Sequence, residues 1–200
     1  MDYVKDETFS QGYDPESYVA SIRNYRSIVK RLSSEAEVDQ QLCDRFRSLV
    51  QAQAGRVRAT VMTEDWCGDA ACNIPILTQL CAEADVPLRV FRGSEHPDMK
   101  DGYEPEGSDH IPVFSLWDGS YNELVRWIEA PQVVDRKKEA WKAERPRFME
   151  LYAQRNDDPE AAKEFASMYR GFLEEMAGWY KDGDWQESVR EICESLEKST

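Results

Sequence analysis

The first quarter of the chain carries two stripes of apolar residues at helical spacing. Asp14 and Pro15 are typical of a helix start, and the stripe behind them consists of Tyr18, Ile22, Tyr25, Val29 and Leu32. Ser34 and Glu37 form a capping box, and the stripe that follows it consists of Val38, Leu42, Phe46 and Leu49. The pattern predicts two antiparallel helices over residues 14–54, behind a tail over residues 1–13.

The period changes to that of a strand after Gly55. Apolar and polar residues alternate from Arg56 to Val61, which predicts a strand. A helical pattern follows over residues 70–84, and we expect Pro75 to kink it. A second strand is predicted over residues 86–92. Strand, helix and strand in this order form a βαβ unit, so we expect the two strands to be parallel.

Two more strands and a helical extension are predicted beyond this unit. Residues 93–109 are polar, with several Pro and Gly, and predict a loop with one short helix. Strands are predicted over residues 112–117 and 123–128, joined by the Asp118-Gly119 signal of an antiparallel hairpin. Helical stripes then continue to the end of the chain, with caps at Asp158 and at Asp184 with Glu187.

These elements predict an α/β fold with a central mixed β-sheet flanked by helices. The expected organisation is a tail over residues 1–13, N-terminal helices over 14–54, a core over 55–130 and a C-terminal helical extension over 131–200. The stripes of the extension are too apolar to stay in water, so we expect it to pack on the core or to form a subunit interface. The second option leaves a homodimer open.

The composition is strongly acidic. Lys and Arg total 25 and Asp and Glu total 39, which gives a net charge of −14. Binding to nucleic acid phosphates requires a basic face, so we expect no nucleic acid partner. No stretch approaches the ~20 apolar residues of a membrane span, and we expect no membrane partner. An acidic solvated surface explains the charge, and adaptation to a high-salt cytoplasm is the alternative.

The cysteines predict a reducing, cytoplasmic location. The acidic first residues contain no apolar segment typical of a secretory signal. The chain has five cysteines, and an odd number in this context argues against a disulfide framework. Their positions are Cys43, Cys67, Cys72, Cys81 and Cys193. No Cys or His spacing typical of a zinc site is present, so we expect neither a metal nor a cofactor.

One cysteine lies where a helix favours its reactive form. Cys67 follows the strand that ends near Val61 and precedes the helix that begins near Ala70. Backbone N–H groups and the positive end of the helix dipole stabilise a thiolate there. The nearby carboxylates of Glu64, Asp65 and Asp69 disfavour it, and the sequence leaves the balance between the two effects open.

The segment Trp66-Cys67-Gly68-Asp69-Ala70 resembles the active site of the thioredoxin superfamily. That family has a W-C-x-x-C motif after its first core strand, and Pro75 stands at the position of its helix proline. Ile111-Pro112 resembles the cis-proline segment of the family. The resemblance implies a thioredoxin-like fold, with Cys67 as the nucleophile and a substrate groove of Trp66, Gly68, Ile111 and Pro112.

Two positions differ from the family pattern. Ala70 replaces the second cysteine of the motif, and Val61 stands where thioredoxins have a buried acid. Asp69 after Cys67-Gly68, together with the C-terminal helical extension, resembles a branch of the family with a W-C-G-D-x motif. Ordinary dithiol chemistry is therefore in doubt.

Three residues are candidates for an accessory role. Asp69 either acts on the thiol or only stabilises the first helical turn. Cys72 is either a resolving thiol or a small buried side chain, and five helical residues separate it from Cys67 by ~7.5 Å, whereas a disulfide requires Cα atoms within roughly 7 Å. The resemblance places His110 beside Cys67, where it either pairs with the thiolate, contacts a substrate or has a structural role.

Three functions remain open on the sequence. The first is a monothiol redox protein, in which Cys67 exchanges with a protein disulfide or with a low-molecular-weight thiol. The second is a binding or adaptor protein without turnover, which the missing second cysteine favours. The third is a dithiol oxidoreductase that uses Cys67 and Cys72.

Overall fold

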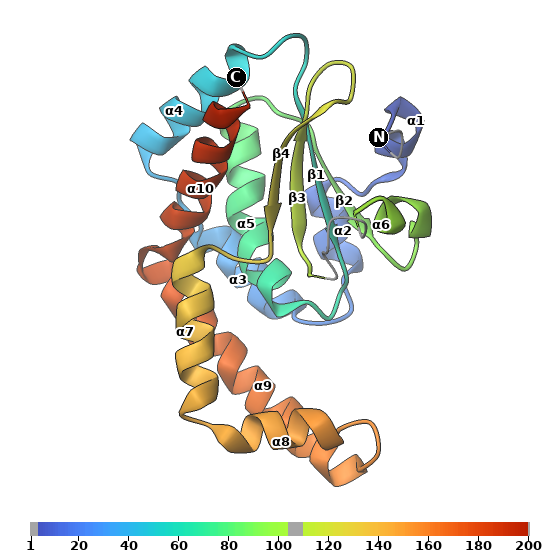
Figure 1. Cartoon of the computed structure of the whole chain (residues 1–200), viewed down its shortest axis with the longest axis vertical. Coiled ribbons are helices and arrows are strands. Elements are labelled where there is room, and N and C mark those ends of the chain that lie inside the picture. Colours follow the sequence, from blue (N-terminus) through green and yellow to red (C-terminus); the bar gives the residue numbers. More distant parts are fainter. Residues whose placement is uncertain (1–3, 104–109, 200) are drawn as a thin grey trace.

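A four-stranded mixed β-sheet forms the centre of the molecule (Figure 1). The computed structural model describes residues 4–103 and 110–199. The strands are β1 (Arg58–Thr63), β2 (Leu88–Arg92), β3 (Val113–Trp117) and β4 (Glu123–Ile128), in the spatial order β2-β1-β3-β4. β1 is parallel to β2 and antiparallel to β3, and β3 is antiparallel to β4. The predicted α/β class, the parallel βαβ pair and the hairpin are confirmed.

Helices lie on both sides of this sheet. The helices before the second strand are α1 (Asp6–Gln11), α2 (Pro15–Ser21), α3 (Arg26–Glu35), α4 (Gln40–Gln51) and α5 (Gly68–Glu83). Those after it are α6 (Pro97–Tyr103), α7 (Gln132–Ala143), α8 (Pro146–Gln154), α9 (Pro159–Trp179) and α10 (Trp185–Lys198), with the π-helical turn η2 (Tyr180–Asp184) before α10. Figure 1 shows α4, α5 and α10 on one side of the sheet and α1 and α6 on the other.

The N-terminal region differs from the predicted tail and helix pair. Residues 6–11 are helical, Val4 is buried, and Tyr13 forms an antiparallel bridge with Val90 of β2. The first predicted helix is divided into α2 and α3. The backbone leaves the helical conformation at Ile22, with ψ of 134°, and is left-handed at Tyr25, with φ of 56°. Apolar spacing persists across this break, so periodicity alone did not reveal it.

Two predicted caps also differ from those in the structure. Asp39 caps α4 by accepting hydrogen bonds from the N–H groups of Gln41 and Leu42, whereas Ser34 lies within α3. Asp184 makes no side-chain cap and instead accepts a hydrogen bond from Lys137 at 2.5 Å. At α4 the later residue Asp39 accepts from the N–H groups that Ser34 was expected to cap, whereas the carboxylate of Asp184 is taken up by the distant Lys137 instead of capping α10.

Alternation along β1 builds a core on each face of the sheet. Ala59 and Val61 belong to the large core between the sheet and the helices α3, α4, α5 and α10, while Met62 belongs to a smaller core on the opposite face. Helix α5 supplies eleven buried residues and continues through Pro75. A helix buried on nearly all sides has little amphipathic character, and this burial fixes the position of its first turn.

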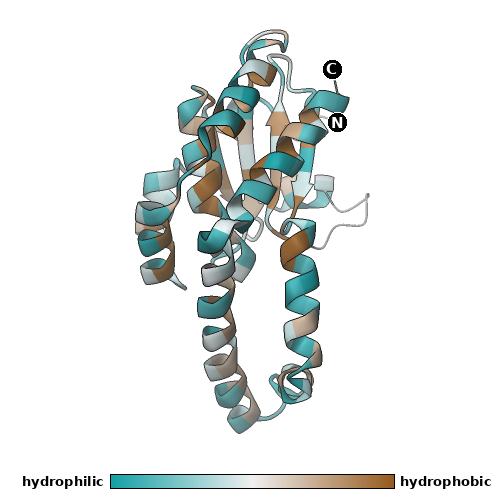
Figure 2. Cartoon of the chain, turned by 90° about the vertical axis from the view of Figure 1, so that its left-hand side faces the viewer, coloured by the Kyte–Doolittle hydropathy of each residue, from teal (hydrophilic) through white to brown (hydrophobic). Residues whose placement is uncertain are grey.

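The C-terminal helices complete the large core and extend beyond it. Val189, Ile192 and Leu196 of α10 are fully buried beside α4, α5 and β4. Helices α7 and α9 run away from the sheet and are joined at their far end through α8 (Figures 1 and 2). Asp158 caps α9, as predicted, by accepting hydrogen bonds from the N–H groups of Glu160 and Ala161. Figure 2 shows hydrophilic and hydrophobic segments interspersed along these helices.

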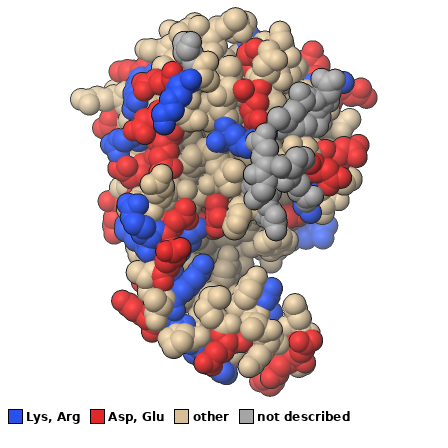
Figure 3. All heavy atoms as spheres, in the orientation of Figure 1, with Lys and Arg blue, Asp and Glu red and all other residues tan. Residues whose placement is uncertain are grey.

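Acidic side chains are spread over the face seen in Figure 3, with Lys and Arg among them. Within the described ranges 4–103 and 110–199, no helix is long and apolar enough to cross a membrane. The short helix expected within the predicted loop over residues 93–109 is α6. Residues 104–109 of that loop lie outside the described residues.

Candidate functional site

Cys67 forms the N-cap of α5. Its Sγ accepts a hydrogen bond from the Ala70 N–H at 3.4 Å and donates one to the Ile111 carbonyl at 3.2 Å. The strand β1 ends four residues earlier, and the next turn leads the chain into the helix. The sulfur is therefore held between the first turn of α5 and the segment before β3. Only 6% of Cys67 is exposed.

The predicted groove residues Trp66 and Ile111 adjoin Cys67. Trp66 precedes it in the chain, and the Ile111 carbonyl accepts the hydrogen bond from the Cys67 sulfur. The peptide bond between Ile111 and Pro112 is cis, and Trp66 is exposed over 61% of its surface. Trp66 and Ile111 line one cavity of about 560 Å³, together with Thr63, Glu64 and Lys100. A large exposed indole beside a cavity is typical of a docking surface.

The environment of Cys67 favours the neutral thiol. Burial, followed by the negative charge of Asp69, raises the pKa of Cys67 to about 12. Hydrogen bonds from the Ala70 N–H and the Thr63 side chain act in the opposite direction. The balance that the sequence left open therefore falls against the thiolate, and Cys67 is protonated at neutral pH.

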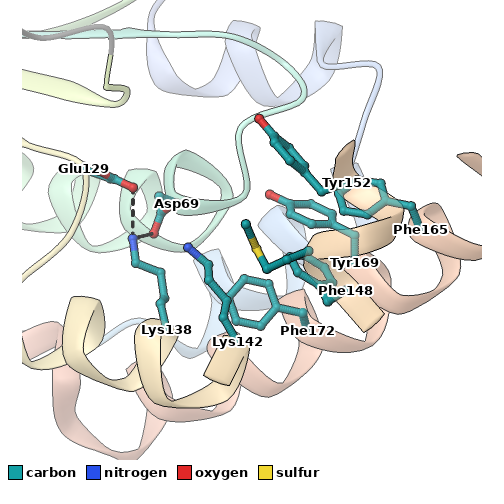
Figure 4. A pocket seen from close by; sticks show the side chains of 10 residues that line it. Asp69, Glu129, Lys138, Lys142, Phe148, Tyr152, Phe165, Tyr169 and Phe172 are labelled. Carbon is teal, nitrogen blue, oxygen red and sulfur yellow. Dashed lines mark hydrogen bonds and ion pairs between the residues drawn. The ribbon is translucent and has the colours of Figure 1, made fainter. Parts of the chain in front are cut away.

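Asp69 belongs to a partly buried ionic cluster that includes a lysine from the C-terminal extension (Figure 4). Lys138 Nζ lies 3.2 Å from Asp69, 3.1 Å from Glu129 and 2.9 Å from Asp135. Burial raises the pKa of Asp69 to about 6, and Lys138 only partly offsets this, since Glu129 and Asp135 share the same cation. The Lys138 side chain is only 7% exposed. Asp69 thus has an ionic role beyond that of a first-turn helix residue.

His110 faces this cluster. Its Nδ1 lies 2.9 Å from Glu129 Oε2, and its side chain is 67% exposed. Glu129 has a positive φ of 65° and donates its N–H to the Pro112 carbonyl at 2.7 Å. The turn after β4 therefore connects His110, the cis-proline segment and Lys138.

Gly68 lies under Tyr169 of α9. A Cβ added at Gly68 would come within 2.5 Å of the Tyr169 hydroxyl and 3.2 Å of Leu173. Only glycine permits this approach, so the predicted groove residue Gly68 serves as the contact between the motif and the extension. Tyr25 of α3 packs against Tyr169 with ring centroids 6.1 Å apart.

Cys72 is fully buried in the middle of α5. Burial raises its pKa well above the usual value, and its carbonyl accepts a hydrogen bond from the indole of Trp185. All five cysteines are free thiols. Helix α5 is continuous between Cys67 and Cys72, so a bond between the two thiols requires its first turn to unwind.

Sequence reasoning missed Lys138, Glu129 and Tyr169. Each lies more than 55 positions along the chain from the motif, and no local spacing relates them to Cys67. Asp135 and Lys138 on α7 resemble an ordinary surface i, i+3 pair. Within the described part of the chain, no three His, Cys, Asp or Glu side chains are placed so that they could hold a metal ion.

The sheet order, the cysteine at the start of α5 and the cis-proline that faces it define a thioredoxin-like protein. A family model described as thioredoxin matches residues 12–142, which is more than half of the chain. The chain belongs to this thioredoxin family, as the resemblance of the motif indicated. The match covers the N-terminal helices, the sheet and α7.

Two solved structures share the fold over nearly the whole chain. A protein of unknown function from Pseudomonas aeruginosa has 18% sequence identity and a TM-score of 0.63, with 96% of each chain covered. An HIV epitope-scaffold has 17% identity and a TM-score of 0.61, with 97% of this chain and 98% of the scaffold covered. At these identities the likeness concerns the fold alone. Among curated proteins, no sequence matches this chain.

Proposed function

We propose that the protein carries out thiol–disulfide exchange with Cys67 as its single nucleophile. The supporting observation is the position of the Cys67 sulfur, which lies between the Ala70 N–H and the Ile111 carbonyl. Exposed Trp66 and the cis-Pro112 segment adjoin it. Ala70 has no thiol, so a partner must resolve the mixed disulfide.

The proposed reaction has two exchange steps. The Cys67 thiolate attacks one sulfur of a substrate disulfide, forms a mixed disulfide with it and releases the other sulfur as a thiolate that takes up a proton. An external thiol then attacks the substrate sulfur of the mixed disulfide. This second step releases a new disulfide and returns Cys67 as a thiol. The net change is a disulfide exchange between two partners, with no net oxidation of the protein.

The hydrogen bond from the Ala70 N–H would hold the Cys67 thiolate once it forms. Asp69 opposes that step through its negative charge. Protonation of Asp69, whose pKa is about 6, removes the opposing charge. Thiol–disulfide exchange at Cys67 is therefore expected to be slow while Asp69 is ionised, and its rate is expected to depend on the charge of Asp69.

The cavity beside Trp66 and Ile111 suits the disulfide of a partner protein. Its wall combines the indole with the polar residues Thr63, Glu64 and Ser94, and an extended peptide can use both kinds of contact. A low-molecular-weight disulfide would reach the same sulfur without needing the whole cavity. The cysteines predict a reducing cytoplasm, and we propose that a thiol of this compartment resolves the mixed disulfide.

Reduction of a mixed disulfide tests the proposal. The substrate is a peptide joined by a disulfide to cysteine, with free cysteine as the external thiol. We expect turnover with the wild-type chain and with Cys72→Ser, and none above the uncatalysed rate with Cys67→Ser. Cys67→Ser retains an oxygen at the N-cap, so the helix start is preserved. Full activity of Cys67→Ser would refute the role of Cys67, and loss of activity in both Cys67→Ser and Cys72→Ser would support the dithiol alternative.

The burial of Cys67 and its raised pKa favour a second candidate, an adaptor without turnover. In that case Trp66 and the cavity beside it bind a partner while the thiol stays unreacted. A partner captured by the wild-type chain would be captured equally by Cys67→Ala and lost with Trp66→Ala. Loss of capture with both variants would contradict the adaptor function.

A further inference from the structure

A second cavity lies between the first turn of α5 and the helices α7, α8 and α9 (Figure 4). Its volume is about 310 Å³, which is at the lower end of the range of ligand pockets. One end is charged and contains Asp69, Glu129, Lys138 and Lys142. The proposed exchange reaction at Cys67 does not use this cavity.

The rest of the wall is apolar and mostly aromatic. It consists of Phe148, Met149, Tyr152, Phe165, Tyr169 and Phe172. The rings contact one another, with centroids 5.1 Å apart for Phe148 and Phe165 and 5.7 Å apart for Phe165 and Tyr169. Met149 and Tyr152 form the rim and are 47% and 46% exposed. A ligand with an apolar body would remove this surface from water.

The two lysines at the charged end differ in their partners. Lys138 is buried and already contacts three carboxylates, those of Asp69, Glu129 and Asp135. Lys142 lies one helical turn further along α7, and Figure 4 shows its amine directed into the cavity. Among residues 4–103 and 110–199, the side-chain amine of Lys142 has no hydrogen-bond or ion-pair partner, whereas its backbone carbonyl accepts from the Arg145 N–H. A half-buried ammonium in this position can gain a charge-assisted hydrogen bond from an anion.

We propose that this cavity binds a small monocarboxylate with an apolar chain or ring. The carboxylate of the ligand pairs with Lys142, and its apolar part packs between the aromatic rings of α8 and α9. A cationic ligand fits less well, because Asp69 and Glu129 already accept hydrogen bonds from Lys138. The amine of Lys142 would repel a cationic headgroup placed beside it.

Octanoate and octylammonium test the proposal, since they have the same chain and opposite charges. Each is titrated into the ¹⁵N-labelled full chain and followed by the shifts of the backbone amides. We expect octanoate to cause saturable shifts at the amides of α7 and α8 around Lys142 and Met149. Octylammonium is expected to bind at least about tenfold more weakly. Equal or tighter binding of octylammonium, or octanoate shifts elsewhere in the chain, would overturn the proposal.

Matched variants distinguish pairing of the ligand carboxylate with Lys142 from apolar binding to the aromatic rings alone. Lys142→Gln is expected to weaken octanoate binding about tenfold, while Lys163→Gln, an exposed change on α9, leaves it unchanged. Met149→Glu places a negative charge on the exposed side of the cavity. This charge repels the carboxylate of octanoate and is expected to weaken its binding as well. Unchanged affinity for octanoate in both Lys142→Gln and Met149→Glu would refute carboxylate binding in this cavity. Cys67→Ser should bind octanoate normally, so the cavity and the exchange reaction can fail independently.

Discussion

Cys67 and Asp69 lie two residues apart, and the negative charge of Asp69 disfavours ionisation of the Cys67 thiol. Burial raises the pKa of both, and the carboxylate adds its charge to the effect on the thiol. The hydrogen bond from the Ala70 N–H remains as the local stabilisation of a thiolate. At the scale of single residues, the reactivity of Cys67 therefore depends on the charge of Asp69.

Replacement of Asp69 by Asn should activate Cys67. The change removes the like charge and keeps a side chain of similar size, so the pKa of Cys67 should fall by about one unit. We expect alkylation of Cys67 by iodoacetamide at pH 8 to become about tenfold faster, measured by mass spectrometry of the Cys67 peptide. Asp157→Asn, an exposed change on the far loop, is the control. An unchanged rate in Asp69→Asn would show that burial alone sets the reactivity.

The ionisation of Asp69 should also appear in the pH dependence of stability. The pKa of Asp69 is about 6 in the folded protein and 3.8 as its ordinary value. A carboxyl group with a raised pKa contributes stability that is present below pH 4 and is lost as the pH rises through 6. We expect the free energy of unfolding to fall by about 3 kcal/mol more in the wild type than in Asp69→Asn between these limits. Urea unfolding at pH 4 and pH 7 measures it, and parallel changes in the two proteins would contradict the raised pKa.

At the scale of elements, one contact joins the motif helix α5 to α9. The Tyr169 hydroxyl occupies the space that a side chain at Gly68 would need. Asn73, one turn further along α5, donates to the Tyr180 hydroxyl at 2.8 Å and accepts from the Ser188 hydroxyl at 3.1 Å. The start and the first turns of α5 are thus positioned by the C-terminal extension as well as by the sheet.

Substitution of Gly68 by Ala tests this contact. The added Cβ would lie 2.5 Å from the Tyr169 hydroxyl, so we expect a loss of about 1–3 kcal/mol in the free energy of unfolding. Tyr169→Phe in the same chain should restore most of that loss. Gly178→Ala is the matched control, because a Cβ there meets nothing within 4 Å. A neutral Gly68→Ala would contradict the close approach of α9.

The helices and strands could be predicted from the sequence more accurately than their boundaries or their contacts with one another. The strands and α5 carry clear periods, and the βαβ order determines which strands pair. The division between α2 and α3 depends on the non-helical backbone at Ile22 and Tyr25, whose side chains nevertheless continue the helical stripe. Cys67, Trp66 and Pro112 could be located because they form a motif. Lys138 could not, since its partner Asp69 is 69 positions away.

At the scale of the whole molecule, the C-terminal helices belong to the same core as the sheet. The buried residues of α10 join one hydrophobic cluster with those of α4, α5 and β4. Arg45 of α4 and Glu197 of α10 add an ion pair at 2.8 Å on the surface of this contact. The two elements are separated by more than 130 positions in the sequence, so their packing links the two ends of the chain.

We therefore expect the chain to unfold as one cooperative unit. Ile192→Ala removes a fully buried side chain of α10 and should lower the free energy of unfolding by about 2–5 kcal/mol. Within each protein, far-UV circular dichroism and tryptophan fluorescence should report the same urea midpoint. That common midpoint should be lower in the variant than in the wild type. Glu194→Ala, an exposed change on the same helix, is the control. A midpoint that shifts in only one of the two signals would indicate an independently folded extension.

The most direct test of the account is to trap the mixed disulfide. The native protein is incubated with bis(2-hydroxyethyl) disulfide at pH 8, and its intact mass and its peptides are measured before and after addition of free cysteine. We predict a single 2-mercaptoethanol adduct on Cys67, released by cysteine and absent from Cys67→Ser. An adduct confined to another cysteine, no adduct at all, or an internal Cys67–Cys72 disulfide would contradict exchange through a single thiol.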